Sequence, residues 1–152
     1  TLMRILAGMF TPDAGTMLVN GTDVTGWDTN AAIAAGVGMV HQHFMLVPTL
    51  TVAENVILGR ELVSGGQLDV ARAEREVREL AERTGLRVEA GRRVSELSVG
   101  EAQRVEILKV LWRGAKILIL DEPTAVLSPP EVDELWKVLR GLRASGDTIV
   151  LI

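Results

Sequence analysis

The chain has 152 residues, of which 47% are hydrophobic, so it is long enough for about one domain and apolar enough to build a buried core. Sixteen basic and 20 acidic residues give a net charge of −4, which argues against a protein that binds nucleic acid through a basic surface. The absence of cysteine excludes disulfides and cysteine-based metal sites. Purely aliphatic runs such as Ile117 to Leu120 are far shorter than the roughly 20 residues that cross a bilayer.

Both ends of the sequence suggest a fragment. It begins at Thr1 rather than Met, and it stops at Ile152 within an apolar run that predicts a strand. We therefore expect a domain that is truncated at both ends, for which the lack of a signal peptide carries no information.

The first part of the chain predicts short elements separated by turns. In order, these are the end of a helix over 1–6 closed by Gly8, a strand over 16–19 turned back at Asn20-Gly21, a helix capped by Asp28 that runs through Ala35 and stops at Gly36, and an apolar strand over 37–40. The stretch 41–48 that follows predicts a loop.

The middle of the chain, 51–112, predicts helices and no strand. A capping box of Thr51 and Glu54 begins the first helix, Asp69 caps a second helix that ends at Gly85, and a third runs from about 99 to 112. Opposite charges interleave along 72–93, which is typical of a solvated helix face rather than an RNA-binding patch.

The C-terminal part predicts a strand over 116–120, a helix that begins at Ser128 and ends before Gly146, and a buried strand over 148–152. Because the strands do not alternate between polar and apolar residues, we expect a parallel sheet that is covered on both faces. The predicted fold class is therefore α/β, with a helical insert in the middle of the chain.

One motif combines a central strand with two acids. Four aliphatic residues, Ile117 to Leu120, run directly into Asp121 and Glu122. Ligands of open α/β sheets bind at the carboxyl ends of the strands, and adjacent carboxylates are expected there when a cation lies close by. In nucleotide hydrolases that cation is Mg²⁺, and the second acid can polarise water. Taken alone, the motif fits equally well a strand that ends in a charged turn.

A second motif, Leu97 to Glu101, precedes the third helix of the middle part. Ser98 and Gly100 would place a hydroxyl and free backbone N–H groups at the positive end of that helix, which suits a phosphate. By itself, Ser98 is more simply explained as an ordinary helix cap.

Taken together, the motifs resemble those of the ATP-binding cassette (ABC) ATPases, and the resemblance covers essentially the whole chain. Leu97 to Glu101 resembles the family's signature, Ile117 to Glu122 its Walker B strand, Ala125 to Ser128 its D-loop, and Gln42 the glutamine of its Q-loop. The implied fold is a P-loop NTPase core with a parallel sheet, a small antiparallel β part and a helical subdomain. We expect one incomplete domain over 1–152, with 1–47 and 113–152 in the catalytic core and 48–112 as the helical subdomain.

One branch of the family is closer than the others. Gly38 to Asn55 and the signature variant at 98–101 resemble the ATPases of bacterial importers for nucleosides and simple sugars. Because one polypeptide usually carries two cassettes in that branch, the chain resembles part of the first. The implied partners are the second cassette, transmembrane permease subunits and, indirectly, a substrate-binding protein, with no nucleic acid. The implied location is the cytoplasmic face of the bacterial plasma membrane.

The resemblance also implies roles for individual residues, with ATP and Mg²⁺ as cofactors. Glu122 would be the general base or water-positioning residue. Asp121 would order Mg²⁺, and Gln42 would sense both Mg²⁺ and the γ-phosphate. The predicted nucleotide contacts are the residues of the signature together with the first residue of the chain: Ser98, Gly100, Glu101, Asp121 and Thr1. Ser98 and Gly100 would bind ATP held by the opposite cassette.

Two parts of the family's site would lie outside this sequence. The Walker A lysine and serine would directly precede Thr1, and the switch histidine would follow Ile152. We therefore expect chain 1–152 alone to be inactive as an ATPase, and measurable turnover by it would contradict this expectation.

The signature departs from the usual pattern, since Val99 replaces a glycine and Glu101 a glutamine. A carboxylate beside phosphate is unfavourable unless it points at ribose or solvent. The variant either marks the weaker of two composite sites or is the branch's normal form, which we favour.

Two other interpretations of the function stay open. A non-transport ABC ATPase acting in DNA repair or translation would more often carry a basic face or a long coiled-coil insert, and neither is present. A degenerate cassette would bind nucleotide without hydrolysing it, but the presence of Glu122 argues against it.

Overall fold

A three-stranded parallel sheet lies at the centre of the computed structural model, which describes residues 1–152. Its strands are β3 (Val37–Val40), β6 (Ile117–Leu120) and β7 (Thr148–Leu151), with β6 in the middle. Leu120 is in register with Val40 on one side and with Leu151 on the other, so all three strands end at the same edge. Segments that follow β3 and β6 therefore emerge next to each other.

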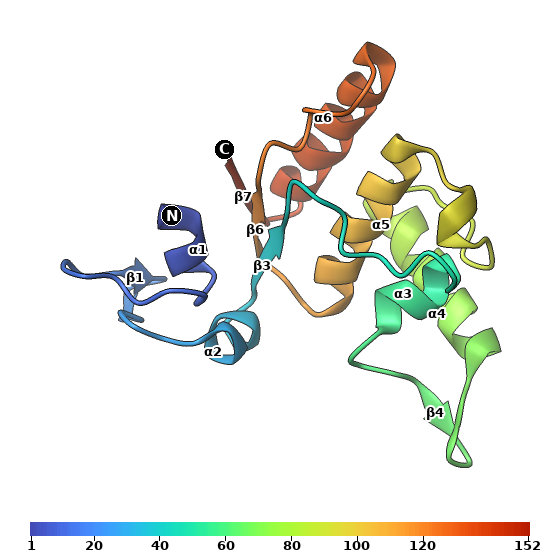
Figure 1. Ribbon diagram of the computed structural model, residues 1–152, viewed down its shortest axis with the longest axis horizontal. Helices are drawn as coiled ribbons and strands as arrows, with labels where there is room; N and C mark the ends of the chain where they lie inside the picture. Colours follow the sequence, from blue (N-terminus) through green and yellow to red (C-terminus); the bar gives the residue numbers. More distant parts are fainter.

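Helices cover both faces of this sheet, as predicted (Figure 1). Ile119 and Val37 pack with residues of α1 (Leu2–Leu6) and α2 (Thr29–Ala34) in a small cluster. Leu118 and Leu120 point to the opposite face and join a cluster of 20 buried residues with α5 (Val99–Trp112) and α6 (Pro129–Ala144). The α/β fold class is confirmed. The expectation of a buried strand at 148–152 is wrong, because β7 is an edge strand whose end residues are exposed.

The middle of the chain forms a helical layer on the α5 side of the sheet. It contains α3 (Val52–Ile57), α4 (Val70–Thr84) and a 3₁₀ helix, Val94–Glu96, just before α5. The capping signals were read correctly, since Thr51 and Glu54 form a reciprocal capping box and Asp69 caps α4. On the solvated face of α4, Arg72 and Glu76 form an ion pair at 2.6 Å.

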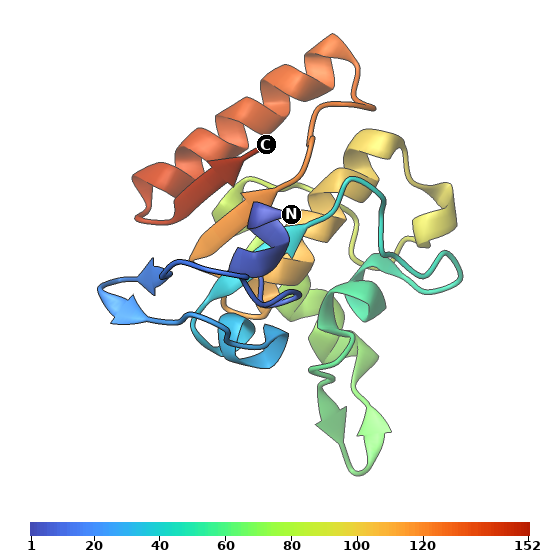
Figure 2. The ribbon, with the colours of Figure 1, turned by 60° about the vertical axis from the view of Figure 1, so that its left-hand side comes forward.

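The prediction of no strand between 51 and 112 is wrong, because a hairpin of β4 (Val63–Ser64) and β5 (Gln67–Leu68) projects from the helical layer (Figure 2). Gly65 and Gly66, at φ 60° and 82°, form its two-residue turn. The other hairpin, β1 (Leu18–Val19) with β2 (Thr22–Asp23), confirms the turn predicted at Asn20-Gly21. None of the helices combines the length and the apolar character that crossing a membrane requires.

Two glycines provide a test of how tightly β3 packs on α5. A Cβ on Gly38, in β3, would lie 2.9 Å from the Cβ atoms of both Ala115 and Val110, whereas a Cβ on Gly141, inside α6, would meet nothing within 4 Å. We expect Gly38→Ala to lower the free energy of unfolding by about 1–3 kcal/mol through overpacking. Gly141→Ala should raise it by about 0.4–1 kcal/mol, because it removes backbone freedom from the unfolded chain. Urea unfolding of the two variants measures this, and equal effects of the same sign would contradict the close packing.

Candidate functional site

The shared edge of the sheet brings together two predicted site residues that are far apart in the sequence. Gln42 follows β3 and Glu122 follows β6, and the Gln42 Nε2 donates a hydrogen bond of 2.8 Å to the Glu122 Oε2 across 80 positions. The strand pairing continues to this point, because the Asp121 N–H donates to the Val40 carbonyl at 3.0 Å. Both side chains are exposed, so a ligand can reach them.

Glu122 has an unusual backbone conformation. Its φ of 45° lies in the left-handed region, which only one other non-glycine residue, the hairpin residue Asn20, adopts. The Glu122 N–H donates to the Ile152 carbonyl and its own carbonyl accepts from the Ala125 N–H, both at 3.1 Å. The end of β7 and the following turn thus hold Glu122 in a conformation that costs on the order of 1–3 kcal/mol and is concentrated at functional sites.

The oxygen atoms at this edge fit Mg²⁺. The carboxylate of Asp121 and the amide oxygen of Gln42 take part in no hydrogen bond, and both are ligand types that Mg²⁺ accepts. No group of three or more His, Cys, Asp and Glu side chains could hold a metal ion without other ligands. An ion bound at this edge would have to complete its shell with phosphate oxygens and water, as Mg²⁺ does in nucleotide sites.

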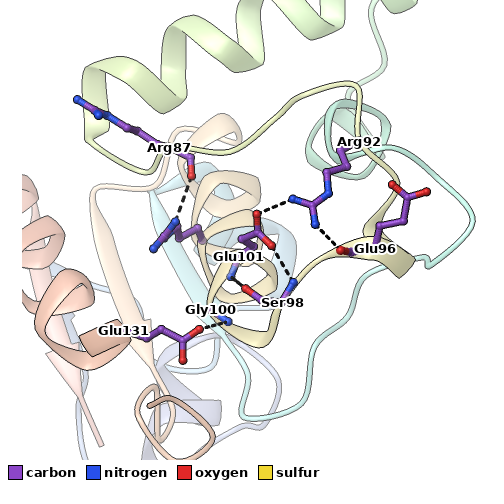
Figure 3. A network of polar contacts seen from close by, with 8 residues as sticks. Arg87, Arg92, Glu96, Ser98, Gly100, Glu101 and Glu131 are labelled. Carbon is purple, nitrogen blue, oxygen red and sulfur yellow. Dashed lines mark hydrogen bonds and ion pairs between the residues drawn. The ribbon is translucent and has the colours of Figure 1, made fainter. Parts of the chain in front are cut away.

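The signature residues form a separate polar network at the start of α5 (Figure 3). Ser98 caps the helix, since its Oγ accepts from the Glu101 N–H at 3.3 Å, and the Glu101 carboxylate accepts in return from the Ser98 N–H at 2.8 Å. The other carboxylate oxygen of Glu101 pairs with Arg92 at 2.7 Å, and Arg92 also donates to the Glu96 carbonyl. The Glu101 carboxylate therefore points back into its own helix cap and toward Arg92.

Glu131, from the first turn of α6, reaches the same helix end. One of its carboxylate oxygens accepts from the Gly100 N–H at 3.2 Å, and the other accepts from the Ser128 N–H and hydroxyl at 2.9 and 2.6 Å. A Cβ at Gly100 would clash with this carboxylate. A single acid therefore caps two helices, and it does so at the amide that the sequence assigned to phosphate.

The electrostatics of the network favour two ionised carboxylates. Accepting the Ser98 N–H lowers the pKa of Glu101 below its usual 4.5, the Arg92 guanidinium lowers it further, and partial burial opposes both. The Ser128 hydroxyl and N–H likewise lower the pKa of Glu131, with a smaller contribution from the Gly100 N–H. Negative charge at a helix N-terminus is stabilised in the same way by the helix dipole.

The predicted site residues thus divide into two groups within one chain. One group, at the sheet edge, contains Gln42, Asp121 and Glu122. The other group, at the start of α5, contains Ser98, Gly100 and Glu101. No hydrogen bond or ion pair joins the two groups. Thr1 is exposed, and its only hydrogen bond is from the Ile5 N–H to its carbonyl.

Several residues of the site region were not identified from the sequence. Arg92 lies within the stretch 72–93 that was interpreted as a solvated helix face, and Glu131 lies in the helix that was predicted to begin at Ser128. The loop after Gln42 is held by Glu106 and Lys109 of α5, which no pattern singled out. An acid on an otherwise buried helix face was the one available signal for Glu106.

A comparison with protein families identifies the chain. A model described as ABC transporter matches residues 1–125. The chain belongs to the ABC transporter family, as an ATP-binding domain. This confirms the resemblance on which the residue assignments were based.

Curated ABC relatives align over nearly all of the chain. It is 49% identical over 152 residues to the nucleoside import ATP-binding protein NupA of Lactococcus lactis subsp. cremoris and 49% identical over 150 residues to the guanosine import ATP-binding protein NupO of Bacillus subtilis. It is 44% identical over 152 residues to the ribose import ATP-binding protein RbsA 1 of Rubrobacter xylanophilus. The chain spans only 29–30% of the length of these three relatives.

Solved ABC cassettes share the fold. The ADP conformation of MJ1267, an ATP-binding cassette of an ABC transporter, matches with a TM-score of 0.82 at 22% identity, covering 99% of this chain and 63% of that one. The ATP-binding cassette MJ0796 bound to ADP and Pi matches with a TM-score of 0.75 at 26% identity, covering 99% and 67%. The fold is therefore that of an ABC ATPase cassette, of which the chain forms a part.

The Glu101 network generates a prediction about stability and pH. Glu101→Ala removes an acceptor from the helix cap and the partner of Arg92, so we expect it to lower the free energy of unfolding by on the order of 1 kcal/mol at pH 7. Because the folded state lowers the pKa of Glu101 from 4.5, this stabilisation is fully present above about pH 4.5 and is lost as the pH falls through the folded-state pKa.

Urea unfolding at pH 7 and in the acid range measures the difference between wild type and variant. Glu101→Gln is the matched control, since its amide oxygen still accepts from Ser98 but does not titrate. If the difference in free energy of unfolding between wild type and Glu101→Ala increased as the pH fell, the lowered pKa assigned to Glu101 would be contradicted.

Proposed function

We propose that the chain is part of an ATP-hydrolysing subunit that energises import through a bacterial ABC transporter. The observation that carries this proposal is the pairing of Gln42 with Glu122 at the edge where nucleotides bind in open α/β sheets. Family membership supports ATP as the nucleotide, and the printed names of the relatives support import as the task.

In this proposal the sheet edge performs the chemistry. Glu122 accepts a proton from the attacking water or orients that water toward the γ-phosphate, and the Gln42 amide holds the Glu122 carboxylate in place. Asp121 and Gln42 would provide oxygen ligands for Mg²⁺, and the ion would neutralise charge on the phosphates. The strained backbone of Glu122 fixes the direction of its side chain before substrate arrives.

The start of α5 has a different role in the proposal. The Ser98 hydroxyl and the Gly100 N–H bind the γ-phosphate of ATP held by a second cassette, because a helix N-terminus favours an anion. Glu101 contributes to this nucleotide site through Ser98, whose N–H it holds, and Thr1 would lie on the α-phosphate side. Separation of the two groups within one chain is consistent with two cassettes that complete each other's sites.

The assembly follows from the same reasoning. The chain spans about 30% of relatives named as import ATP-binding proteins, which leaves room for a second cassette in the same polypeptide. We place residues 1–47 and 113–152 in the catalytic core and 48–112 in the helical subdomain that docks on the permease. A substrate-binding protein acts indirectly, and the assembly lies at the cytoplasmic face of the plasma membrane.

Nucleosides are favoured over sugars as cargo, since the two nucleoside-type relatives are 49% identical to this chain and the glucose and ribose relatives are 43–44% identical to it.

The central prediction concerns Glu122. In the full-length protein, Glu122→Gln should lower ATP turnover by about 100-fold or more, because the amide cannot accept a proton, while ATP binding persists and a closed, ATP-bound state accumulates. Phosphate release and nucleotide retention measure both effects. Asp133→Asn, an exposed carboxylate of α6 that makes no hydrogen bond or ion pair, is the control and should leave turnover unchanged. Unchanged turnover in Glu122→Gln would reject its catalytic role.

Uptake of labelled solutes tests the cargo. Cells that depend on this transporter should lose uptake of nucleosides when they carry Glu122→Gln, and retain uptake of ribose and arabinose. Loss of sugar uptake with intact nucleoside uptake would reverse the preference and leave the import function standing.

A further inference from the structure

Two side chains of α5 hold the loop that follows Gln42 by the backbone of a single residue, Met45. The Glu106 Oε1 accepts from the Met45 N–H at 2.5 Å, and the Lys109 Nζ donates to the Met45 carbonyl at 3.0 Å. Glu106 and Lys109 are three positions apart on the helix and therefore point the same way. Both backbone groups of Met45 are held from one surface, although the residue as a whole is 64% exposed.

An acidic residue at position 106 carries a desolvation cost, because its side chain lies in the protein interior. It is only 4% exposed, and burial raises the pKa of its carboxyl, while the Met45 N–H and the charges of Lys109, His41 and Arg113 oppose that rise. An apolar residue of similar size would fill this position in α5 without the cost of desolvating an acid. Its one hydrogen bond is to Met45, so the loop contact is the specific interaction that this acid supplies.

The loop does not depend on Glu106 for its general path. Two residues further on, Asn55 of α3 holds Val47 in a similar way, accepting from its N–H at 2.7 Å and donating to its carbonyl at 3.0 Å. Asn55 is fully buried and anchors the loop to the helical layer. Glu106 and Lys109 therefore add a second anchor, placed closer to Gln42.

The distance along the chain makes this second anchor consequential. Met45 is three residues after Gln42, a connection that spans at most about 10 Å when extended. One end of the connection is fixed to the sheet edge by the hydrogen bond from Gln42 to Glu122, and the other end is fixed to α5. Because the connection is this short, we expect a shift of the Met45 backbone to move Gln42 as well.

We propose that Glu106 and Lys109 are positioning residues. Through their hydrogen bonds to the Met45 backbone, they determine where Gln42 lies relative to Glu122. This inference rests on the proposed function, since it assigns the pair a part in ATP hydrolysis. Neither residue touches the nucleotide. They act on the turnover step because a displacement of about 1 Å at a reacting centre can lower a rate by up to about 100-fold.

The test uses the full-length protein, three variants at positions 106 and 109, and two control variants. Glu106→Ala and Lys109→Met remove the grip, and Glu106→Gln keeps an oxygen that can accept from Met45. Asp147 and Lys116 are the matched control, because they form another pair of buried acid and exposed lysine, at 3.2 Å, at the opposite end of the strands. Asp147→Asn and Lys116→Met remove that pair without affecting the loop.

We expect Glu106→Ala and Lys109→Met to lower kcat for ATP hydrolysis by about 10- to 100-fold with less than about a twofold change in KM. Glu106→Gln should restore most of the activity, and the control variants should retain the kcat of the wild type. In a Gln42→Ala background, Glu106→Ala should have little further effect, because the pair acts through Gln42. If Glu106→Ala fails to fold, Lys109→Met decides, since its side chain is only partly buried.

Three results would overturn the inference: wild-type kcat in Lys109→Met and Glu106→Ala, no rescue by Glu106→Gln in a folded protein, or additive losses in the Gln42→Ala background. Failure of the proposed function would give a different result. Glu122→Gln would then retain ATP turnover, or the wild-type protein would show no ATP turnover.

Discussion

The alignment of β3 with β6 is the constraint on which the candidate catalytic edge depends. Because Val40 and Leu120 are in register, the two residues after each strand emerge side by side, and Gln42 meets Glu122 at 2.8 Å although 80 positions separate them. β3 also packs closely at Gly38, where a Cβ would lie only 2.9 Å from the Cβ atoms of Val110 and Ala115. The packing at Gly38 and the position of Gln42 therefore both depend on where β3 lies.

Carboxylates organise the second group of residues. Glu101 and Glu131 satisfy backbone N–H groups at the starts of α5 and α6, which would otherwise lack partners in the first turn of each helix. Arg92 neutralises Glu101 and ties the preceding turn to it through the Glu96 carbonyl. The structure thus explains why an acid stands at position 101, where a carboxylate near phosphate was difficult to rationalise: its charge is used within the cap.

Much of this could be predicted from the sequence, for reasons that are local. The capping boxes at Thr51 and Ser128, and the turn at Asn20-Gly21, depend on residues within a few positions of one another. The aliphatic run of β6 and the acids after it are equally local signals. The hairpin at 63–68 was missed because its strands have two residues each, too few for a periodic pattern.

The long-range contacts could not be predicted, because they depend on how elements pack. Nothing in the spacing of Glu131 and Gly100 indicates that α6 begins against the start of α5. The hydrogen bond from the Met45 N–H to Glu106 joins residues 61 positions apart. An acid within a helix does not by itself indicate which distant backbone group it will bind. Family resemblance gave the identities of the site residues, and the fold determines which of them touch.

Gly100 illustrates how a structural requirement and a functional one can fall on the same residue. The family assigns this glycine to phosphate, yet the Glu131 carboxylate already lies where a Cβ would be and already accepts from its N–H. A phosphate that binds this amide must therefore displace or share with Glu131, while Ser128 keeps that acid at the helix start. The presence of glycine at 100 is thus explained without any nucleotide. The catalytic argument accordingly depends on the sheet edge, where the strained Glu122 and its bond to Gln42 have no comparable structural purpose.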